Sequence, residues 1–113
     1  MKSTTEAVLQ NHLRAATIGP EAVMQDYTDQ SVIITEAGTY RGLTEIRQFF
    51  TNLFAGLPTG FFKGIKMNSQ EVVGEVAYIN WEWAPLIQRA TDTYVVRDGK
   101  ILFQTFTALM TAT

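Results

Sequence analysis

The order of hydrophobic and polar residues predicts helices in the first part of the chain. Ser3 and Glu6 fit a capping box, in which a hydroxyl and a carboxylate satisfy free backbone N–H groups, so a helix is expected to begin there. Three- and four-residue spacing then gives one apolar stripe that includes an imidazole: Val8, Leu9, His12, Leu13 and Ala16. Gly19 is expected to end this helix. Pro20 suits the first position of a second, short helix over residues 20–27.

The middle of the chain predicts a strand, a tight return and a third helix. Residues 31–35 are rich in β-branched side chains and predict a strand, and residues 37–42 predict a return with a short paired strand. A helix is expected over residues 43–55 because its apolar side chains recur at helical spacing, as Ile46, Phe49, Phe50, Leu53 and Phe54. Pro58 and the glycines on either side of it are expected to stop this helix.

The second half of the chain predicts four strands, at about residues 62–73, 75–84, 89–96 and 100–109. Their links are short, so consecutive strands are expected to be antiparallel. Helices first and a curled sheet afterwards indicate an α+β domain with the helices on one face. A chain of 113 residues is expected to form one domain with its own core.

Composition narrows the possible partners. The nine Lys and Arg residues are scattered and the net charge is −2, so we expect no nucleic-acid partner. The chain has no Cys, a single His and unclustered acids, which predicts no metal site and no cofactor. No stretch approaches the roughly 18 apolar residues of a membrane span, and the N-terminus lacks the apolar core of a signal peptide. A cytoplasmic protein without a membrane partner is therefore expected.

Three runs of the sequence resemble one known family. Residues 15–20 leading into residues 27–34, residues 38–50, and the closing hairpin at residues 92–108 are similar to the nuclear-transport-factor-two-like superfamily, in its SnoaL-like and ketosteroid-isomerase-like branches. The likeness covers nearly the whole chain. It implies a cone, in which a curved, mixed, mainly antiparallel sheet wraps around three helices in the order α-α-β-β-α-β-β-β-β and encloses a cavity for a small molecule. It also implies a homodimer through the convex face of the sheet.

The resemblance assigns chemistry to His12 and Asp92. His12 falls where ketosteroid isomerases carry the tyrosine that bonds the substrate carbonyl, and Asp92 falls at their second oxyanion-hole donor, a protonated acid. Burial raises the pKa of a carboxyl group until it can donate a hydrogen bond, as the ketosteroid isomerases themselves exemplify. The alternative for His12 is a core histidine bonded to a backbone carbonyl. The alternatives for Asp92 are a carboxylate that bonds N–H groups of a helix or loop, and an acid at the rim of the sheet.

The hairpin turn decides the direction of Asp92. With a two-residue turn at Asp98 and Gly99, Asp92 would lie opposite Thr105 and Gln104 would lie on the other face. With a three-residue loop over residues 97–99, Asp92 would lie opposite Gln104, on one face with Tyr94, Leu102 and Phe106. The family match requires the three-residue loop, which we therefore expect.

Residues 81–83 leave a similar choice. Alternation alone favours Trp81 and Trp83 in the core, with Asn80 and Glu82 in solvent. The family register instead points Tyr78, Asn80 and Glu82 into the cone, and we expect this arrangement. Glu82 and Asp92 would then form an acid–base pair. The convex dimer face would comprise Ile79, Trp81, Trp83 and Phe103.

The chain also departs from the ketosteroid isomerases. Thr35 replaces their aspartate base, Glu36 would point the other way, and Phe50 replaces a supporting tyrosine. We therefore expect a protein that binds an apolar, ring-containing metabolite, with isomerase- or cyclase-type acid–base chemistry on His12, Asp92 and Glu82. The expected wall comprises Thr35, Phe50, Phe54, Tyr78, Asn80, Tyr94, Gln104 and Phe106. The alternative is a non-catalytic dimeric module for ligand binding or protein assembly, and fold cannot choose between them.

Overall fold

The computed structural model describes residues 4–111 and has the expected order of elements, with one short 3₁₀ helix added. The helices are α1 (Thr4–Ala16), α2 (Pro20–Met24), α3 (Gly42–Gly56) and the 3₁₀ helix η1 (Phe61–Gly64). The strands are β1 (Val32–Thr35), β2 (Gly38–Arg41), β3 (Lys66–Val73), β4 (Val76–Trp83), β5 (Ile87–Arg97) and β6 (Lys100–Met110). The expected cap residue Ser3 lies outside the described residues.

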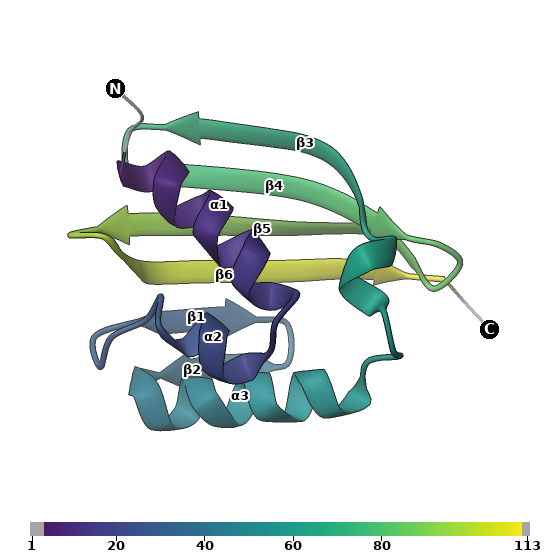
Figure 1. The fold of residues 1–113 in the computed structure, drawn as a ribbon, viewed down its shortest axis with the longest axis horizontal. Helices are drawn as coiled ribbons and strands as arrows, with labels where there is room; N and C mark the ends of the chain where they lie inside the picture. Colours follow the sequence, from purple (N-terminus) through teal and green to yellow (C-terminus); the bar gives the residue numbers. More distant parts are fainter. Residues whose placement is uncertain (1–3, 112–113) are drawn as a thin grey trace.

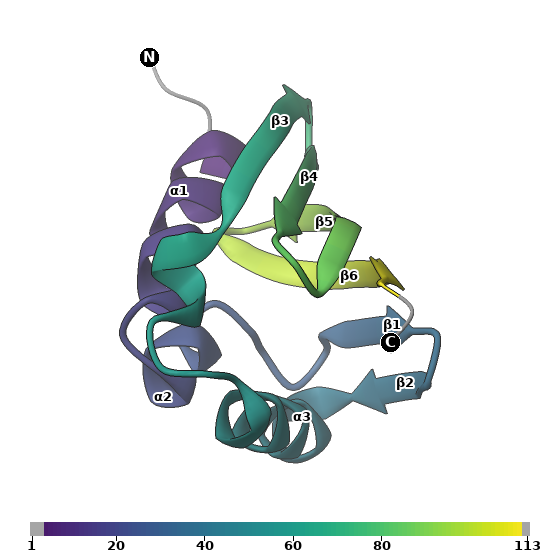
Figure 2. The same ribbon diagram turned by 90° about the vertical axis from the view of Figure 1, so that its right-hand side faces the viewer.

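The six strands form one mixed sheet in the order β2-β1-β6-β5-β4-β3. The pairing of β1 with β6 is parallel and every other pairing is antiparallel. The sheet is strongly curved, with α1 crossing its concave side over β4 and β5 and α3 lying against β1 and β2 (Figures 1 and 2). The predicted α+β cone is confirmed.

Apolar faces hold the helices against the sheet. In α1 the buried residues are Thr5, Leu9, His12 and Ala15, and in α3 they are Ile46 and Phe50. Leu9, His12, Ile46 and Phe50 were predicted on these faces, whereas Thr5 and Ala15 were not. The predicted Val8, Leu13 and Ala16 are half-buried against the same core. Gly42 begins α3 at a φ of +79°, where a Cβ atom would lie 3.1 Å from the Asp29 carboxylate. Glycine is therefore needed at this bend by both its backbone angle and its surroundings.

Three predicted boundaries were inaccurate. The second helix ends at Met24 rather than near residue 27, and the strand expected from residue 62 begins only at Lys66 because η1 precedes it. Strand β5 begins at Ile87, two residues before the expected start. Ile87 is buried, so its early pairing extends the inner face of the sheet.

The β5–β6 hairpin has the two-residue turn that the family match had argued against. Arg97 pairs with Lys100, and Asp98 and Gly99 both have positive φ, at 53° and 77°. The predicted three-residue loop was therefore wrong. A bulge just beyond the turn, where Val95 pairs with Phe103 but Val96 pairs with Ile101, leaves one extra residue, Leu102, in β6.

This bulge decides the face of Asp92. It shifts the register so that Asp92 pairs with Phe106 and Tyr94 pairs with Gln104. Asp92, Tyr94, Gln104 and Phe106 therefore share the concave face as expected, whereas Leu102 is not in that set and Asp92 is not directly opposite Gln104.

The predicted orientation of β4 was wrong. Ala77, Ile79 and Trp81 are buried on the concave face, and Tyr78, Asn80 and Glu82 alternate onto the other face. A large indole gains more from burial than a carboxylate, which would need a counter-charge inside. The plain alternation pattern was the better guide here.

Candidate functional site

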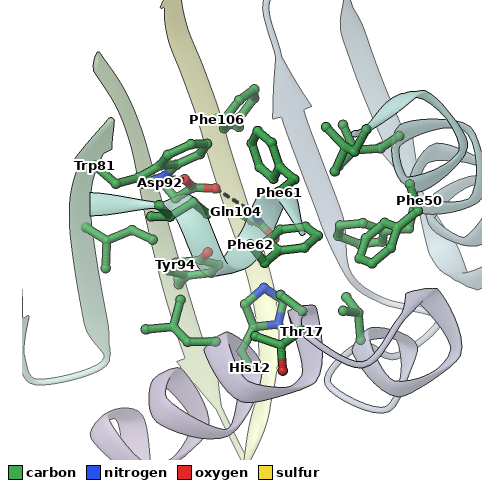
Figure 3. Close-up of a pocket in the computed structure, with 18 of the residues that line it drawn as sticks. His12, Thr17, Phe50, Phe61, Phe62, Trp81, Asp92, Tyr94, Gln104 and Phe106 are labelled. Carbon is green, nitrogen blue, oxygen red and sulfur yellow. Dashed lines mark hydrogen bonds between the residues drawn. The ribbon is translucent and has the colours of Figure 1, made fainter. Parts of the chain in front are cut away.

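A pocket of about 310 Å³ lies between the helices and the concave face of the sheet. Its wall is mainly apolar and draws on α1, α3, η1 and strands β3–β6. Figure 3 shows Trp81, Asp92, Tyr94, Gln104 and Phe106 on the sheet side, with His12 from α1 and Phe50 from α3 on other sides. The structure therefore brings seven predicted residues together around the pocket: His12, Phe50, Phe54, Asp92, Tyr94, Gln104 and Phe106.

His12 is held by a buried acid that the sequence analysis did not identify. Its Nδ1 lies 2.8 Å from the Asp26 Oδ2, and both residues are 5% exposed. The ring also makes edge contacts with Tyr27 and Tyr94, at centroid distances of 5.8 and 5.3 Å. The alternative of a histidine bonded only to backbone is therefore excluded. The carboxylate fixes the ring from behind while the ring lines the pocket.

Asp92 accepts hydrogen bonds at both carboxyl oxygens. The Trp81 Nε1–H donates to Oδ1 at 2.9 Å and the Gln104 Nε2–H donates to Oδ2 at 3.0 Å. The Tyr27 hydroxyl in turn donates to the Gln104 Oε1. The Tyr94 side chain is a further hydrogen-bonding partner of Asp92. The chain of donors runs from the Tyr27 hydroxyl through the Gln104 amide to the carboxylate.

Burial and hydrogen bonding act in opposite directions on Asp92. Burial raises the pKa of Asp92 above the ordinary carboxyl value, while the bonds from Trp81 and Gln104 and the nearby His12 limit that rise. Burial, together with the charge of Asp92, raises the pKa of both Tyr27 and Tyr94 well above the usual tyrosine value. The two hydroxyl groups consequently stay protonated and act as donors to the polar network.

Four predicted site residues do not line the pocket: Thr35, Tyr78, Asn80 and Glu82. The Thr35 Oγ1 bonds the Gly38 carbonyl and accepts the amides of residues 37 and 38, so it stabilises the β1–β2 turn. Glu82 lies 3.9 Å from Lys66 Nζ on the outer side of the sheet. The expected acid–base pair of Glu82 with Asp92 is therefore not formed.

The expected dimer residues also divide between the two faces. Ile79 and Trp81 line the pocket, and the Trp83 ring packs against Phe61 at a centroid distance of 5.0 Å. Only Phe103, at 44% exposed, lies open on the outer face. The alternative of a protein-assembly module relied on an exposed face formed by Trp81 and Trp83, and the structure has no such face.

The pairing of Asp26 with His12 could have been predicted from their equal distance in sequence from the turn between α1 and α2. His12 and Asp26 lie seven residues before and after Gly19, where α1 turns back into α2. A helical hairpin brings such equidistant positions together. The aromatic residues of η1, Phe61 and Phe62, were also missed, since a strand was expected from residue 62 and no element was expected at Phe61.

The part of the chain that the structure describes has neither a metal-binding cluster nor a membrane-spanning helix. Within residues 4–111, no three His, Asp or Glu side chains are grouped so as to hold a metal ion. None of the helices in the same range is long and apolar enough to cross a membrane.

Comparison with known proteins gives similarity in structure alone. No protein-family model and no curated protein matches the chain by sequence. An NTF2-like protein of unknown function from Mesorhizobium loti superimposes with a TM-score of 0.74 at 18% identity, over 94% of this chain and 91% of that one. A de novo designed protein with a curved β-sheet gives the same TM-score and identity, over 96% and 88%.

Further similar structures carry descriptions of ligands or activities. A protein with a ketosteroid-isomerase-like fold from Catenulispora acidiphila, in complex with trimethylamine, has a TM-score of 0.66 at 11% identity, over 88% of this chain and 82% of that one. Others are a proposed polyketide cyclase from Sinorhizobium meliloti and a proposed isomerase of the SnoaL-like family from Agrobacterium tumefaciens. At such identities the likeness shows the fold. The chain has the nuclear-transport-factor-two-like (NTF2-like) cone fold that is also found in SnoaL-like and ketosteroid-isomerase-like proteins.

Proposed function

We propose that this protein binds a small, largely apolar, ring-containing molecule in the pocket and carries out acid–base chemistry on it, of the isomerase or cyclase type. The pocket volume of about 310 Å³ falls at the lower end of the range for small-molecule sites. Its aromatic wall suits a flat ring. The similar proteins described as a cyclase and an isomerase are consistent with this class of reaction, and the one solved with trimethylamine shows that the fold has held a small amine.

The observation that carries the proposal is the pair of His12 and Asp26. A neutral imidazole that donates its Nδ1–H to the Asp26 carboxylate has Nε2 as its proton acceptor. Since His12 lines the pocket, Nε2 is the atom that takes a proton from a bound molecule and returns it elsewhere. The carboxylate of Asp26 stabilises the imidazolium that forms in between. His12 is thus our catalytic residue and Asp26 its positioning residue.

Asp92 has a separate role, at the sheet side of the pocket. Trp81 and Gln104 hold its carboxyl group in a fixed position, and the rings of Tyr94 and Phe106 belong to the same wall. Asp92 therefore binds the polar end of the ligand, while the phenylalanine rings of α3 and η1 contact the apolar body. This division leaves proton transfer to His12.

Hydrogen–deuterium exchange tests the proposal. The bicyclic ketone 2-tetralone tests the proposed role of His12 separately from that of Asp92, because it is apolar, carries acidic C–H groups beside its carbonyl and has no N–H or O–H group for a carboxylate to accept from. We expect the wild-type protein in D₂O to speed exchange of those C–H groups, measured by proton NMR. His12→Gln should abolish the acceleration, and Ile34→Ala on the outer sheet face should keep it.

Calorimetric binding of 2-tetralone separates the possible failures. Binding without exchange would overturn the catalytic half of the proposal and favour a non-catalytic ligand-binding protein. An absence of both binding and exchange would overturn the ligand-binding half of the proposal, and exchange that persists in His12→Gln would overturn the assignment of His12.

A further inference from the structure

Burial raises the pKa of Asp92, and the groups bonded to its carboxyl group oppose that rise because they favour the charged form. Trp81 Nε1 has a hydrogen to donate and no lone pair to accept with, so its bond requires an acceptor oxygen. The Gln104 amide presents its N–H₂ side to Asp92 because the Tyr27 hydroxyl donates to its oxygen. Hydrogen bonds donated to a carboxylate stabilise the ionised state.

The described residues leave this buried charge without a cation of its own. Asp92 is 6% exposed, and none of the ion pairs among residues 4–111 includes it. His12, which lies near enough to affect it, is paired with Asp26. A buried carboxylate without a counter-charge is costly, so a positive group that entered the pocket would be strongly attracted to it.

Aromatic rings gather at the same place. The Trp81 ring stacks with Phe106 at 6.3 Å and an interplanar angle of 24°, and Phe61 meets Trp81 edge-on at 6.1 Å. The side chain of Tyr94, two residues further along β5 on the same face, also bonds the carboxylate. Figure 3 shows these rings around the Asp92 carboxyl group. The electron-rich faces of aromatic rings attract cations, and most strongly where water is excluded.

We propose that the ligand of this pocket is an organic cation, a molecule whose positively charged nitrogen sits against Asp92 and the rings of Trp81, Tyr94 and Phe106. The inference rests on the proposed ligand-binding function and adds the chemical class of the ligand. A neutral ligand of the same shape would cover the carboxylate without balancing its charge, and an anion would be repelled by it. The apolar body of the cation would extend towards Phe50 and Phe54 on α3.

Two isosteric probes test this class directly. Phenyltrimethylammonium and tert-butylbenzene have nearly the same shape, and only the first carries a charge. By isothermal titration calorimetry we expect the wild-type protein to bind the cation at least about tenfold more tightly than the neutral probe. Equal affinities in the wild-type protein would overturn the inference without any variant.

A matched pair of variants assigns the preference to Asp92. Asp92→Asn keeps the size of the side chain and removes its charge, so the affinity for the cation should fall to about that of the neutral probe. Glu71→Gln removes one charge from an exposed position on β3 and should leave the preference unchanged. An equal loss in both variants would mean that net charge, rather than the site, attracts the cation, and would overturn the inference.

The two probes also separate this inference from the proposed function. If both bind the wild-type protein equally, the pocket still binds apolar ligands and only the cation preference fails. If neither binds, the ligand-binding role fails with it. Circular dichroism checks that each variant is folded. If Asp92→Asn does not fold, the ratio of the two probe affinities in the wild-type protein still tests the preference for a cation.

Discussion

At the residue scale, His12 and Asp26 form a buried pair whose two members depend on each other. Asp26→Ala leaves the His12 Nδ1 without its partner, and an unsatisfied buried polar group costs roughly 1–3 kcal/mol. We therefore expect the free energy of unfolding in urea to fall by about that amount. Replacing both partners by apolar residues removes the unmet group. The loss of unfolding free energy in the double variant His12→Phe/Asp26→Leu should therefore be smaller than the sum of the losses in His12→Phe and in Asp26→Leu. Additive costs would show that the pair is not coupled.

The burial of Asp92 leads to a prediction about how the stability of the protein depends on pH. Its pKa is raised by burial, so between the unfolded and folded pKa values the folded protein binds more protons than the unfolded chain. Its contribution to stability is complete below the unfolded pKa and is lost as pH rises through the folded pKa. The stability of the wild-type protein relative to Asp92→Asn should accordingly decline as pH rises from about 4 towards neutrality.

Urea unfolding of both proteins across this pH range measures the decline. The new amide changes the contact with Gln104 equally at every pH, so it offsets the curve without changing its slope. A relative stability that rises with pH would mean that the hydrogen bonds from Trp81 and Gln104 outweigh burial.

At the element scale, the β5–β6 hairpin shows what local sequence can and cannot decide. The pair Asp98 and Gly99 predicts a two-residue turn by its own chemistry, and the turn has that form. The extra residue Leu102 has no comparable local signal, since a bulge is set by how the whole strand packs. The family likeness therefore predicted the face of Asp92 correctly. It did so through a three-residue turn, whereas a two-residue turn followed by a bulge produces that face in the structure.

Strand β4 shows the opposite case. Its alternation divides the side chains into two faces, and sequence alone does not say which face the sheet turns inwards. Trp81 was placed outside by the family register, although its burial and its bond to Asp92 make it part of the pocket. Helix faces were easier to predict, because the stripes of α1 and α3 contain a single apolar side each.

Glycine at the hairpin turn gives a prediction for the element itself. Gly99 has a φ of +77°, which an L side chain adopts at a cost of roughly 1–2 kcal/mol. Gly99→Ala should therefore lower the free energy of unfolding by about that amount. Gly56, at the end of α3, is a matched control because its φ is not positive and an added Cβ would meet nothing within 4 Å. A cost for Gly99→Ala no larger than that for Gly56→Ala would contradict the assigned turn.

At the scale of the whole molecule, fold and function separate. The same cone is found in a designed protein and in proteins described as a cyclase or an isomerase. The shape therefore provides a place for a ligand, whereas the chemistry depends on which polar side chains reach it. Here His12 reaches the pocket on one side, and Asp92 with Tyr94 and Gln104 on the other, all four of which were named from the sequence. Asp26, which holds His12 from behind, was not.

The outer face of the sheet carries our last prediction, on assembly. Phe103 on β6 and Ile34 on β1 are 44% and 46% exposed and lie on strands that pair directly. A second copy of the chain would cover these side chains, as the family likeness leads us to expect. We predict a dimer that Phe103→Glu converts to a monomer, because a carboxylate buried opposite its own copy would be unpaired.

Sedimentation velocity measures this change, with circular dichroism as the check on folding. Ile18→Glu is the control: Ile18 is 73% exposed, but it lies in the turn between α1 and α2, away from the sheet. It should leave the dimer intact because the added charge stays in solvent. A monomeric wild-type protein, or a dimer that persists in Phe103→Glu, would rule out this face as the interface.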